Sequence, residues 1–490
     1  MRGIYTPVTQ IRRQIFQKVA ELGFSGDFSK VDEIPYEIIK GEVASYRDSV
    51  FKERAIVAER IRLACGLSVR GADENAPISK DFQKAVATDR VFEAPLVNVI
   101  PFACNACPET AYEVTNNCRG CLAHPCTSVC PVKAVSIVKG KSVIDKSKCV
   151  KCGRCAEFCP YDAIVKYDRP CSAACGVDAI ESDHLGRAVI NQDKCVSCGQ
   201  CLVSCPFAAI ADKSQIFQLI LALKEKGDIF AEIAPAFVGQ FGPLATPNKV
   251  KAALLELGFA GVYEVALGAD GVSINEAREF VEKVPNELPF LATSCCPSWS
   301  VMAKAFIPEF AHCISDALTP MVETARLIKK EHPQSRVVFI GPCASKKLEA
   351  FRKTVRSDVD FVITFEELMG IFAAKEIDFS QNSDNTMEDA AATGRGFAVS
   401  GGVADAVVSC IKREHPDMEV LVDRAEGLAN CKKMLTLARL GKRNGYLLEG
   451  MACEGGCVGG AGTLQPPKKA AIQVKKFAEE SQYKNALDKE

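Results

Sequence analysis

The spacing of hydrophobic residues predicts helices at the start of the chain. Within residues 1–95, Ile15, Val19 and Leu22 recur at intervals of three and four, which gives a helix one apolar face. Residues 43–63 repeat this pattern and predict a second helix. We expect residues 1–95 to form a helical N-terminal region that packs against the rest of the protein.

A different pattern begins at residue 228. Short apolar runs, at residues 229–233, 288–293, 336–340 and 446–448, are each followed by a loop and then by a helical pattern. Strands that alternate with helices are typical of parallel α/β sheets. We therefore predict an α/β domain over residues 213–490.

Length, charge and cysteine content narrow the possible functions. The chain has 490 residues, a formal net charge of −1 and 25 cysteines. No apolar run reaches the roughly 18 residues that span a bilayer, and the N-terminus lacks the apolar segment of a signal peptide. The net charge argues against nucleic acid as the main partner. We expect a cytoplasmic protein with no membrane association, in which the cysteines bind metal.

Residues 96–212 contain two complete C-x2-C-x2-C-x3-C-P runs, one from Cys149 and one from Cys195. This spacing is the bacterial iron–sulfur signature, and zinc is the weaker alternative. In ferredoxins with two clusters, the fourth cysteine of each run binds the other cluster. The rule predicts one cluster on Cys149, Cys152, Cys155 and Cys205, and a second on Cys195, Cys198, Cys201 and Cys159.

The remaining cysteines of this segment form two incomplete or irregular runs. The same rule assigns a third cluster to Cys118, Cys121, Cys126 and Cys175, and a fourth to Cys104, Cys107, Cys171 and Cys130. Three clusters with spare thiols are the alternative. His124 is either an unusual ligand or a structural side chain. We expect residues 96–212 to form an α+β ferredoxin-like domain.

Three further cysteine motifs each follow an apolar run of the α/β part. Because ligands gather at the carboxyl ends of the strands of α/β sheets, three such loops can converge on one cluster. The last loop is rich in glycine, which allows close approach of the backbone to a cluster. The sequence therefore predicts one further iron–sulfur cluster on four cysteines from these loops: Cys296, Cys343, Cys453 and Cys457.

The three loops together resemble the [FeFe]-hydrogenase catalytic domain. The family signatures are found here at Thr293–Trp299, Pro342–Glu349 and Glu449–Gly462, in the family's order. The resemblance implies an α/β catalytic domain of two lobes with its cluster at the carboxyl ends of strands. It also implies reversible formation of H2 from protons and electrons, with a ferredoxin or similar protein as the electron carrier.

The resemblance also implies an active-site cofactor, the H-cluster. It consists of a [4Fe–4S] cubane joined through Cys457 to a diiron unit that carries CO, cyanide and an azadithiolate, and dedicated maturation proteins supply that unit. By position, Cys295 passes protons to the azadithiolate amine, Lys346 donates a hydrogen bond to a cyanide, and Met451 packs beside the diiron unit.

The family's proton path corresponds here to Glu276, Ser315 and Glu279. The two glutamates are three residues apart, so a helix places them on one face. Burial can bring a carboxyl pKa toward the working pH, which suits proton transfer.

Five residues depart from the common family pattern: Ser298 replaces glycine, Gly341 methionine, Glu454 proline, Ala236 serine and Met321 glutamine. These positions lie outside the predicted cubane ligands and indicate a divergent branch of the family.

Three other functions remain open. The first is an H2 or redox sensor on the same scaffold, but no signalling module is evident after Gly462. The second is an iron–sulfur assembly protein without the diiron unit, which need not keep Cys295, Lys346 and Met451 together. The third is a simple electron-transfer protein, which would not need the α/β part.

Overall fold

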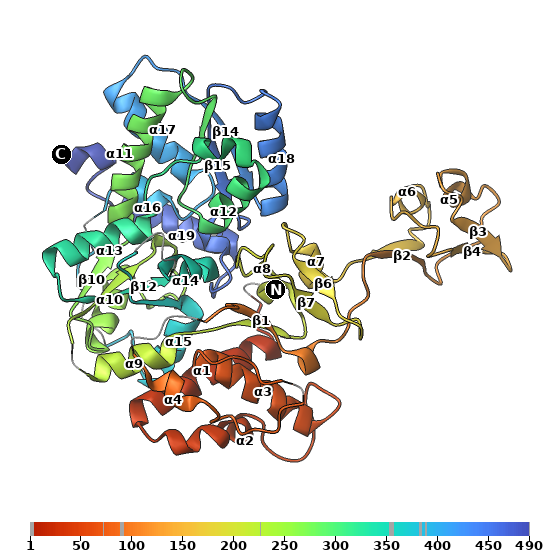
Figure 1. The fold of residues 1–490 in the computed structure, drawn as a ribbon, viewed down its shortest axis with the longest axis horizontal. Helices are drawn as coiled ribbons and strands as arrows, with labels where there is room; N and C mark the ends of the chain where they lie inside the picture. Colours follow the sequence, from red (N-terminus) through yellow and green to blue (C-terminus); the bar gives the residue numbers. More distant parts are fainter. Residues whose placement is uncertain are drawn as a thin grey trace.

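Helices, parallel sheets and two small cysteine-rich units make up the protein (Figure 1). Within the described ranges, no helix combines the length and apolarity that crossing a bilayer demands. The α/β class expected for the second half is present, whereas the domain boundaries at residues 95 and 212 stay predictions. The computed structural model describes residues 4–71, 73–88, 93–225, 227–351, 357–381, 385–387 and 390–489.

The N-terminal region is helical, as predicted. Thr6 caps the first helix by accepting the N–H of Thr9, and the face that includes Ile15, Val19 and Leu22 is buried. The helices are α1 (Pro7–Ser25), α2 (Ile34–Ile38), α3 (Val50–Ala64) and α4 (Phe82–Val86).

The second predicted helix begins later than expected. The backbone N–H groups of Ser45, Tyr46 and Arg47 donate to the buried carboxylate of Glu53. Because these amides are already paired outside a helix, α3 starts only at Val50.

The N-terminal helices share a hydrophobic core with the second half of the chain. α1 packs against α9 (Ile216–Lys224) and α15 (Phe365–Ala374). A Cβ atom on Gly370 would lie 2.6 Å from the Cβ atom of Phe16, so the two helices touch through their backbones.

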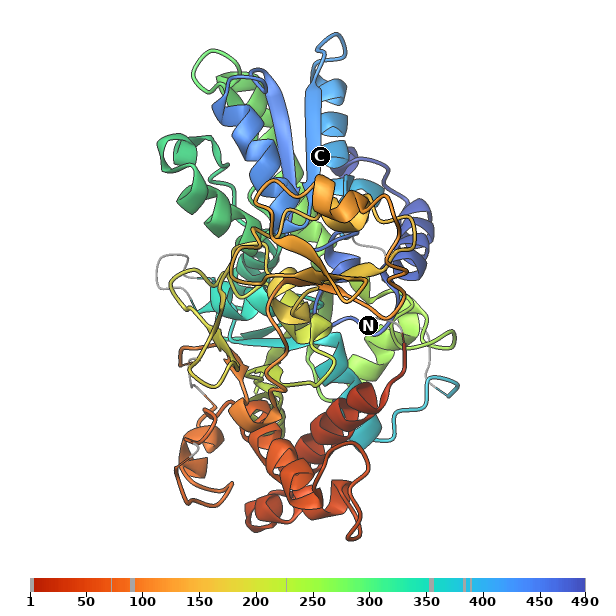
Figure 2. The same ribbon diagram turned by 90° about the vertical axis from the view of Figure 1, so that its right-hand side faces the viewer.

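The cysteine-rich segment folds into two units. The outer unit projects from the body, and the inner unit lies between it and the α/β part (Figures 1 and 2). The outer unit contains β2 (Ala111–Val114), α5 (Pro125–Ser128), β3 (Val135–Val138), β4 (Lys141–Ile144), α6 (Arg154–Glu157) and β5 (Ile164–Tyr167). The inner unit contains β1 (Val97–Val99), α7 (Pro170–Ala173), β6 (Ile180–Ser182), β7 (Ala188–Ile190), α8 (Gln200–Ser204) and β8 (Ile210–Asp212).

Two parallel sheets form the α/β part. The first has the strand order β10-β9-β12-β13 and the second β11-β15-β14. The three cysteine loops therefore leave two different sheets: one follows β12, and the other two follow β11 and β15. The strands are β9 (Ile229–Ile233), β10 (Gly261–Glu264), β11 (Phe290–Ala292), β12 (Arg336–Gly341), β13 (Phe361–Thr364), β14 (Leu421–Glu426) and β15 (Tyr446–Met451).

Helices cover both sheets and supply most of the side chains discussed below. They are α10 (Pro247–Glu256), α11 (Ala266–Lys283), α12 (Pro297–Phe306), α13 (Pro320–Glu331), α14 (Ala344–Ala350), α16 (Ala392–Gly396), α17 (Gly402–Glu414), α18 (Leu428–Arg439) and α19 (Pro467–Glu479).

Candidate active site

The end of β15 and the glycine-rich loop that follows it are held by close contacts at two glycines. A Cβ atom on Gly450 would lie 2.2 Å from the ring of Trp299, and one on Gly460 would lie 2.4 Å from the carbonyl oxygen of Pro342. Glycine is required at both positions because any side chain would collide. These contacts bring the loop of one sheet against the loop that follows β12 of the other sheet.

Glu449, the first residue of that motif, orients the loop. Its buried carboxylate accepts the N–H groups of Gly401 at 2.7 Å and Ala404 at 2.8 Å. These amides lie at the N-terminus of α17, where a negative charge is favourable. Glu449 therefore ties the end of β15, just before the loop, to α17.

The predicted cubane cysteines come from both sheets. Cys296 and Cys343 are the N-cap residues of α12 and α14. Burial raises the pKa of the Cys457 thiol to about 12, and the neighbouring Cys343 and Cys296 contribute to that shift. Cys453 lies in the same loop as Cys457, on the side that faces the inner unit, where it accepts a hydrogen bond from Gln200.

A cavity of about 80 Å³ lies beside these cysteines. Among its lining residues are Cys295, Lys346 and Met451, three of the predicted catalytic side chains, all of them buried. Most of the remaining wall is apolar. A buried ammonium in such surroundings requires an anionic partner. The residues present therefore fit a small group that carries both apolar and anionic ligands, such as the predicted diiron unit.

Departures from the resembled pattern make this cavity more apolar. A Cβ atom on Gly341 would lie 2.4 Å from the ring of Phe339, so this ring occupies the space that a side chain at position 341 needs. Ala236 and Met321, where serine and glutamine are common, are fully buried in the wall. Glu454 is exposed, and nothing in the structure explains its replacement of proline.

The two lysines after Cys343 have different partners. Lys346 lines the cavity, and its Nζ atom lies 2.6 Å from Oε2 of Glu349. Lys347 points elsewhere and forms ion pairs with Asp212 at 2.8 Å and Glu367 at 2.7 Å. Lys346 therefore serves the cavity, whereas Lys347 ties the inner unit to α15.

Glu276 lies between Cys295 and the outer part of the predicted proton path. It is fully buried, and its carboxylate accepts the N–H of Ser294 at 3.0 Å. Burial raises the pKa of Glu276 to about 7, although hydrogen bonds from Ser294 and Ser315 oppose that shift. Burial raises the pKa of the Cys295 thiol, and the charge of Glu276 raises it further. The two side chains are thus electrostatic neighbours.

The path continues from Ser315 toward the surface. The Ser315 hydroxyl donates to Oε2 of Glu279 at 2.7 Å, and Lys283 lies 3.1 Å from Oε1 of Glu279. The sequence prediction missed Ser294 and Lys283. Lys283 is four residues after Glu279 on the same helix, a spacing that could have identified it, whereas no sequence signal identifies Ser294.

Replacing Glu276 with glutamine should change how stability depends on pH. The carboxyl pKa is 4.5 in the unfolded chain and about 7 in the fold, so the folded state keeps a proton between these values that the unfolded chain releases. Wild-type stability should therefore fall, relative to Glu276→Gln, as the pH rises from 4.5 to 7, by roughly 2–3 kcal/mol. Urea unfolding at pH 5 and pH 8 tests this, and an unchanged difference between the two proteins would contradict it.

The sixteen predicted accessory cysteines gather in four groups. In the outer unit, Cys118, Cys121, Cys126 and Cys159 line one small cavity, together with His124. Burial raises the pKa of the Cys155 thiol most, and the neighbouring Cys149, Cys152 and Cys130 raise it further. In the inner unit, Cys104, Cys107, Cys171 and Cys205 line one small cavity, and the pKa of the Cys201 thiol is raised by burial and then by Cys198, Cys195 and Cys175.

Fourth cysteines are exchanged between runs, as predicted, but the predicted partner runs are wrong. The prediction joined the two runs of identical spacing, which placed Cys205 with the Cys149 run and Cys159 with the Cys195 run. In the structure the exchange takes place within each unit, because β2 pairs with β5 and holds the Cys118 run against the Cys149 run. Cys175 and Cys205 likewise exchange within the inner unit, and Cys130 stays in the outer one.

The inner unit touches the catalytic loops directly. The side-chain amide of Gln200 donates to Sγ of Cys453 at 3.1 Å. The Ser298 hydroxyl donates to the carbonyl of Val196 at 3.0 Å, a bond that the glycine common at this position could not form. These contacts join the loop of Cys195, Cys198 and Cys201 to the predicted cubane.

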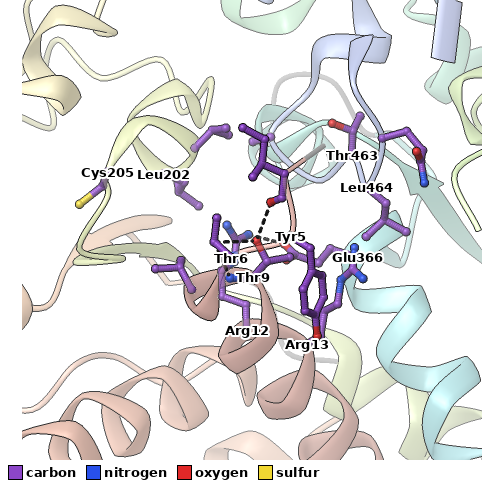
Figure 3. Close-up of a pocket in the computed structure, with 15 residues that line it drawn as sticks. Tyr5, Thr6, Thr9, Arg12, Arg13, Leu202, Cys205, Glu366, Thr463 and Leu464 are labelled. Atoms are coloured by element: carbon purple, nitrogen blue, oxygen red, sulfur yellow. Dashed lines mark hydrogen bonds and ion pairs between the residues drawn. The ribbon is translucent and has the colours of Figure 1, made fainter. Parts of the chain in front are cut away.

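Another cavity lies away from this site, near the N-terminus (Figure 3). It measures about 240 Å³ and is lined by residues of α1, the inner unit and the loop after Gly460. Arg12, in its wall, is ion-paired with Glu366. Of the predicted site residues only Cys205 borders it, with its sulfur directed away from the labelled side chains.

Comparison with known families assigns three parts of the sequence. Residues 228–461 match the model described as iron only hydrogenase large subunit, C-terminal domain. Residues 142–165 match a 4Fe-4S binding domain, and residues 165–216 match the LdpA Fe-S cluster-binding domain.

Individual relatives include hydrogenases and an assembly factor. Iron hydrogenase 1 of Clostridium pasteurianum is 28% identical over 291 residues, which are 50% of this chain and 50% of that protein. The periplasmic [Fe] hydrogenase large subunit of Nitratidesulfovibrio vulgaris is 29% identical over 385 residues, 68% of this chain and 87% of that protein. The cytosolic Fe-S cluster assembly factor NAR1 of Kluyveromyces lactis is 36% identical over 99 residues, 20% of this chain and 21% of that protein. The chain thus spans half the length of the first of these relatives.

Proposed function

We propose that this protein catalyses the reversible reaction 2H⁺ + 2e⁻ ⇌ H2, because residues 228–461 match the model of the iron only hydrogenase large subunit, C-terminal domain. The observation that carries the proposal is the cavity beside the cubane cysteines, with Cys295, Lys346 and Met451 together in its wall. An electron-transfer protein has no need for such a cavity.

The cavity residues would hold the cofactor by separate contacts. Cys296, Cys343, Cys453 and Cys457 would bind the cubane, with Cys457 also bound to the diiron unit. Lys346 would donate to an anionic ligand of that unit, and Met451 would pack beside it. When bound, the diiron unit supplies the metal site at which protons and electrons combine.

The proton route proposed here runs along α11. Cys295 would exchange its thiol proton at the cavity with the carboxyl of Glu276. Ser315 would connect Glu276 to Glu279, since its hydroxyl already donates to Glu279. A carboxyl with a pKa of about 7 can both accept and release a proton near neutral pH, which supports Glu276 in this role.

The electron route proposed here runs through the two cysteine-rich units. Cys152 of the outer unit is exposed, so a ferredoxin or similar carrier could approach a cluster there. The four cysteine groups would bind four [4Fe–4S] clusters, and these clusters would pass electrons inward. The hydrogen bond from Gln200 to Cys453 would join the last of them to the catalytic cubane.

An iron–sulfur assembly function is the second candidate, because NAR1 is among the relatives. It predicts clusters without a diiron unit. A sensor on the same scaffold would carry the diiron unit but turn over slowly.

Infrared spectroscopy of the matured full-length protein tests the proposal. We expect CO and cyanide bands together with H2 evolution from a reduced low-potential carrier. Clusters without those bands would favour the assembly function, and bands with negligible turnover would favour a sensor. The iron content of the same sample distinguishes four accessory clusters from three.

A further inference from the structure

Glu232 is a buried carboxyl that the proposed reaction does not use. It lies in β9, between β10 and β12, and its exposed fraction is 0%. Neither carboxyl oxygen has a hydrogen-bond partner among the described residues. A buried carboxyl without such partners destabilises a fold, most of all when it is ionised.

Glu232 lies directly behind the wall of the catalytic cavity. Alternate residues of a strand share a face, so Glu232 lies on the same face as Ala234. Phe339 of β12 pairs with Glu232 in register. Because Ala234 and Phe339 both line the cavity, Glu232 approaches it from the first sheet, whereas Glu276 approaches it from α11.

The charges that act on Glu232 come from α14. Burial has the largest effect and raises the pKa of Glu232 well above its ordinary range, whereas the charge of Lys346 lowers this pKa and that of Glu349 raises it. On β10, the residue in register is Tyr263, and its hydroxyl donates to Glu331 on α13.

Lys346 already has a carboxylate partner. Its Nζ atom lies 2.6 Å from Oε2 of Glu349, and Thr319 donates to the same oxygen at 3.2 Å. One buried ammonium therefore acts on two buried carboxyls: it contacts Glu349 directly, and it acts on Glu232 through its charge. If both carboxyls were ionised, the site would bury a net negative charge, so one of them must hold a proton.

We propose that Glu232 is a reserve partner of Lys346: it keeps its proton while Glu349 neutralises the ammonium, and it ionises when Glu349 does not. Glu232 is then a positioning residue that sets the charge of the cavity wall. The wall is neutral with Glu232 protonated and carries one negative charge after its proton leaves. Loss or gain of one proton at Glu232 can thus offset a change in the charge of a group bound at Lys346. The presence of such a group rests on the proposed function.

Infrared spectra of the full chain in D2O at pH 7 test the charge states without the diiron unit. The carbonyl band of a protonated carboxyl should be present in the wild type and absent from Glu232→Gln. It should also disappear in Glu349→Gln, because the released ammonium ionises Glu232. The band of Glu276, identified with Glu276→Gln, is the control and should be unaffected by Glu349→Gln. A Glu232 band that is missing from the wild type, or that persists in Glu349→Gln, would overturn the proposal.

Stability provides an independent measurement. Glu349→Gln should raise the unfolding equilibrium constant roughly 10-fold more in the Glu232→Gln background than in the wild type, because the double variant leaves Lys346 without a carboxylate. Additive effects would overturn the proposal. Since neither test uses CO bands or H2 turnover, a failure of the hydrogenase proposal is recognised separately.

Discussion

Replacement of Cys295 by serine should lower the rate of H2 evolution by roughly 100- to 10,000-fold, the usual contribution of a positioned proton-transfer group. Cys295 is buried in the cavity wall and is an electrostatic neighbour of Glu276. A serine hydroxyl is a far weaker acid than a thiol, so it cannot release a proton at the same rate. Turnover of the matured variant, with iron content and infrared bands recorded on the same sample, measures the effect.

Cys313→Ser is the matched control. Cys313 is also buried, but it belongs to the core around Trp299 and does not line the cavity. Folded Cys313→Ser protein should keep wild-type turnover. Near-normal turnover of Cys295→Ser, with its cofactor bands intact, would remove Cys295 from the proton path.

Replacement of Lys347 by methionine should destabilise the protein by about 3–5 kcal/mol, the cost of breaking a buried ion pair from one side. Lys347 is fully buried between the carboxylates of Asp212 and Glu367. Its removal leaves both carboxylates without their ammonium where the inner unit meets α15. Urea unfolding followed by circular dichroism measures the loss.

Lys18→Met provides the comparison for that experiment. Lys18 also lies between two carboxylates, Glu21 at 2.9 Å and Glu37 at 2.8 Å, but its side chain is 34% exposed. Water already solvates these charges, so the loss should stay below about 1 kcal/mol. Equal losses in the two variants would show that burial does not set the strength of the Lys347 pairs.

The elements could be predicted from the sequence because their signals are local. Thr6 and Thr246 each precede a proline and cap a helix, as their positions indicate. The loops of Cys296, Cys343 and Cys457 were found because each follows an apolar strand. The start of α3 could not be predicted, because it depends on how Glu53 binds the preceding loop.

The features that could not be predicted depend on which distant segments of the chain become neighbours in the fold. Identical spacing suggested that the Cys149 and Cys195 runs share clusters, but strand pairing joins each run to a different neighbour. The division of the strands into two sheets also has no local signal. Glu232 could not be identified from the sequence, since a glutamate in an apolar run does not reveal that it lies behind a cavity.

The packing of α1 against α15 has a consequence for biosynthesis. Arg12 and Glu366, which pair across this contact, are separated by 354 positions in the chain. The apolar face of α1 therefore leaves the ribosome 354 residues ahead of its partner surface on α15. The side of α1 that packs on α15 stays uncovered while the intervening residues are made, so this part of the core closes late. We expect newly made chains to need protection from aggregation during this interval.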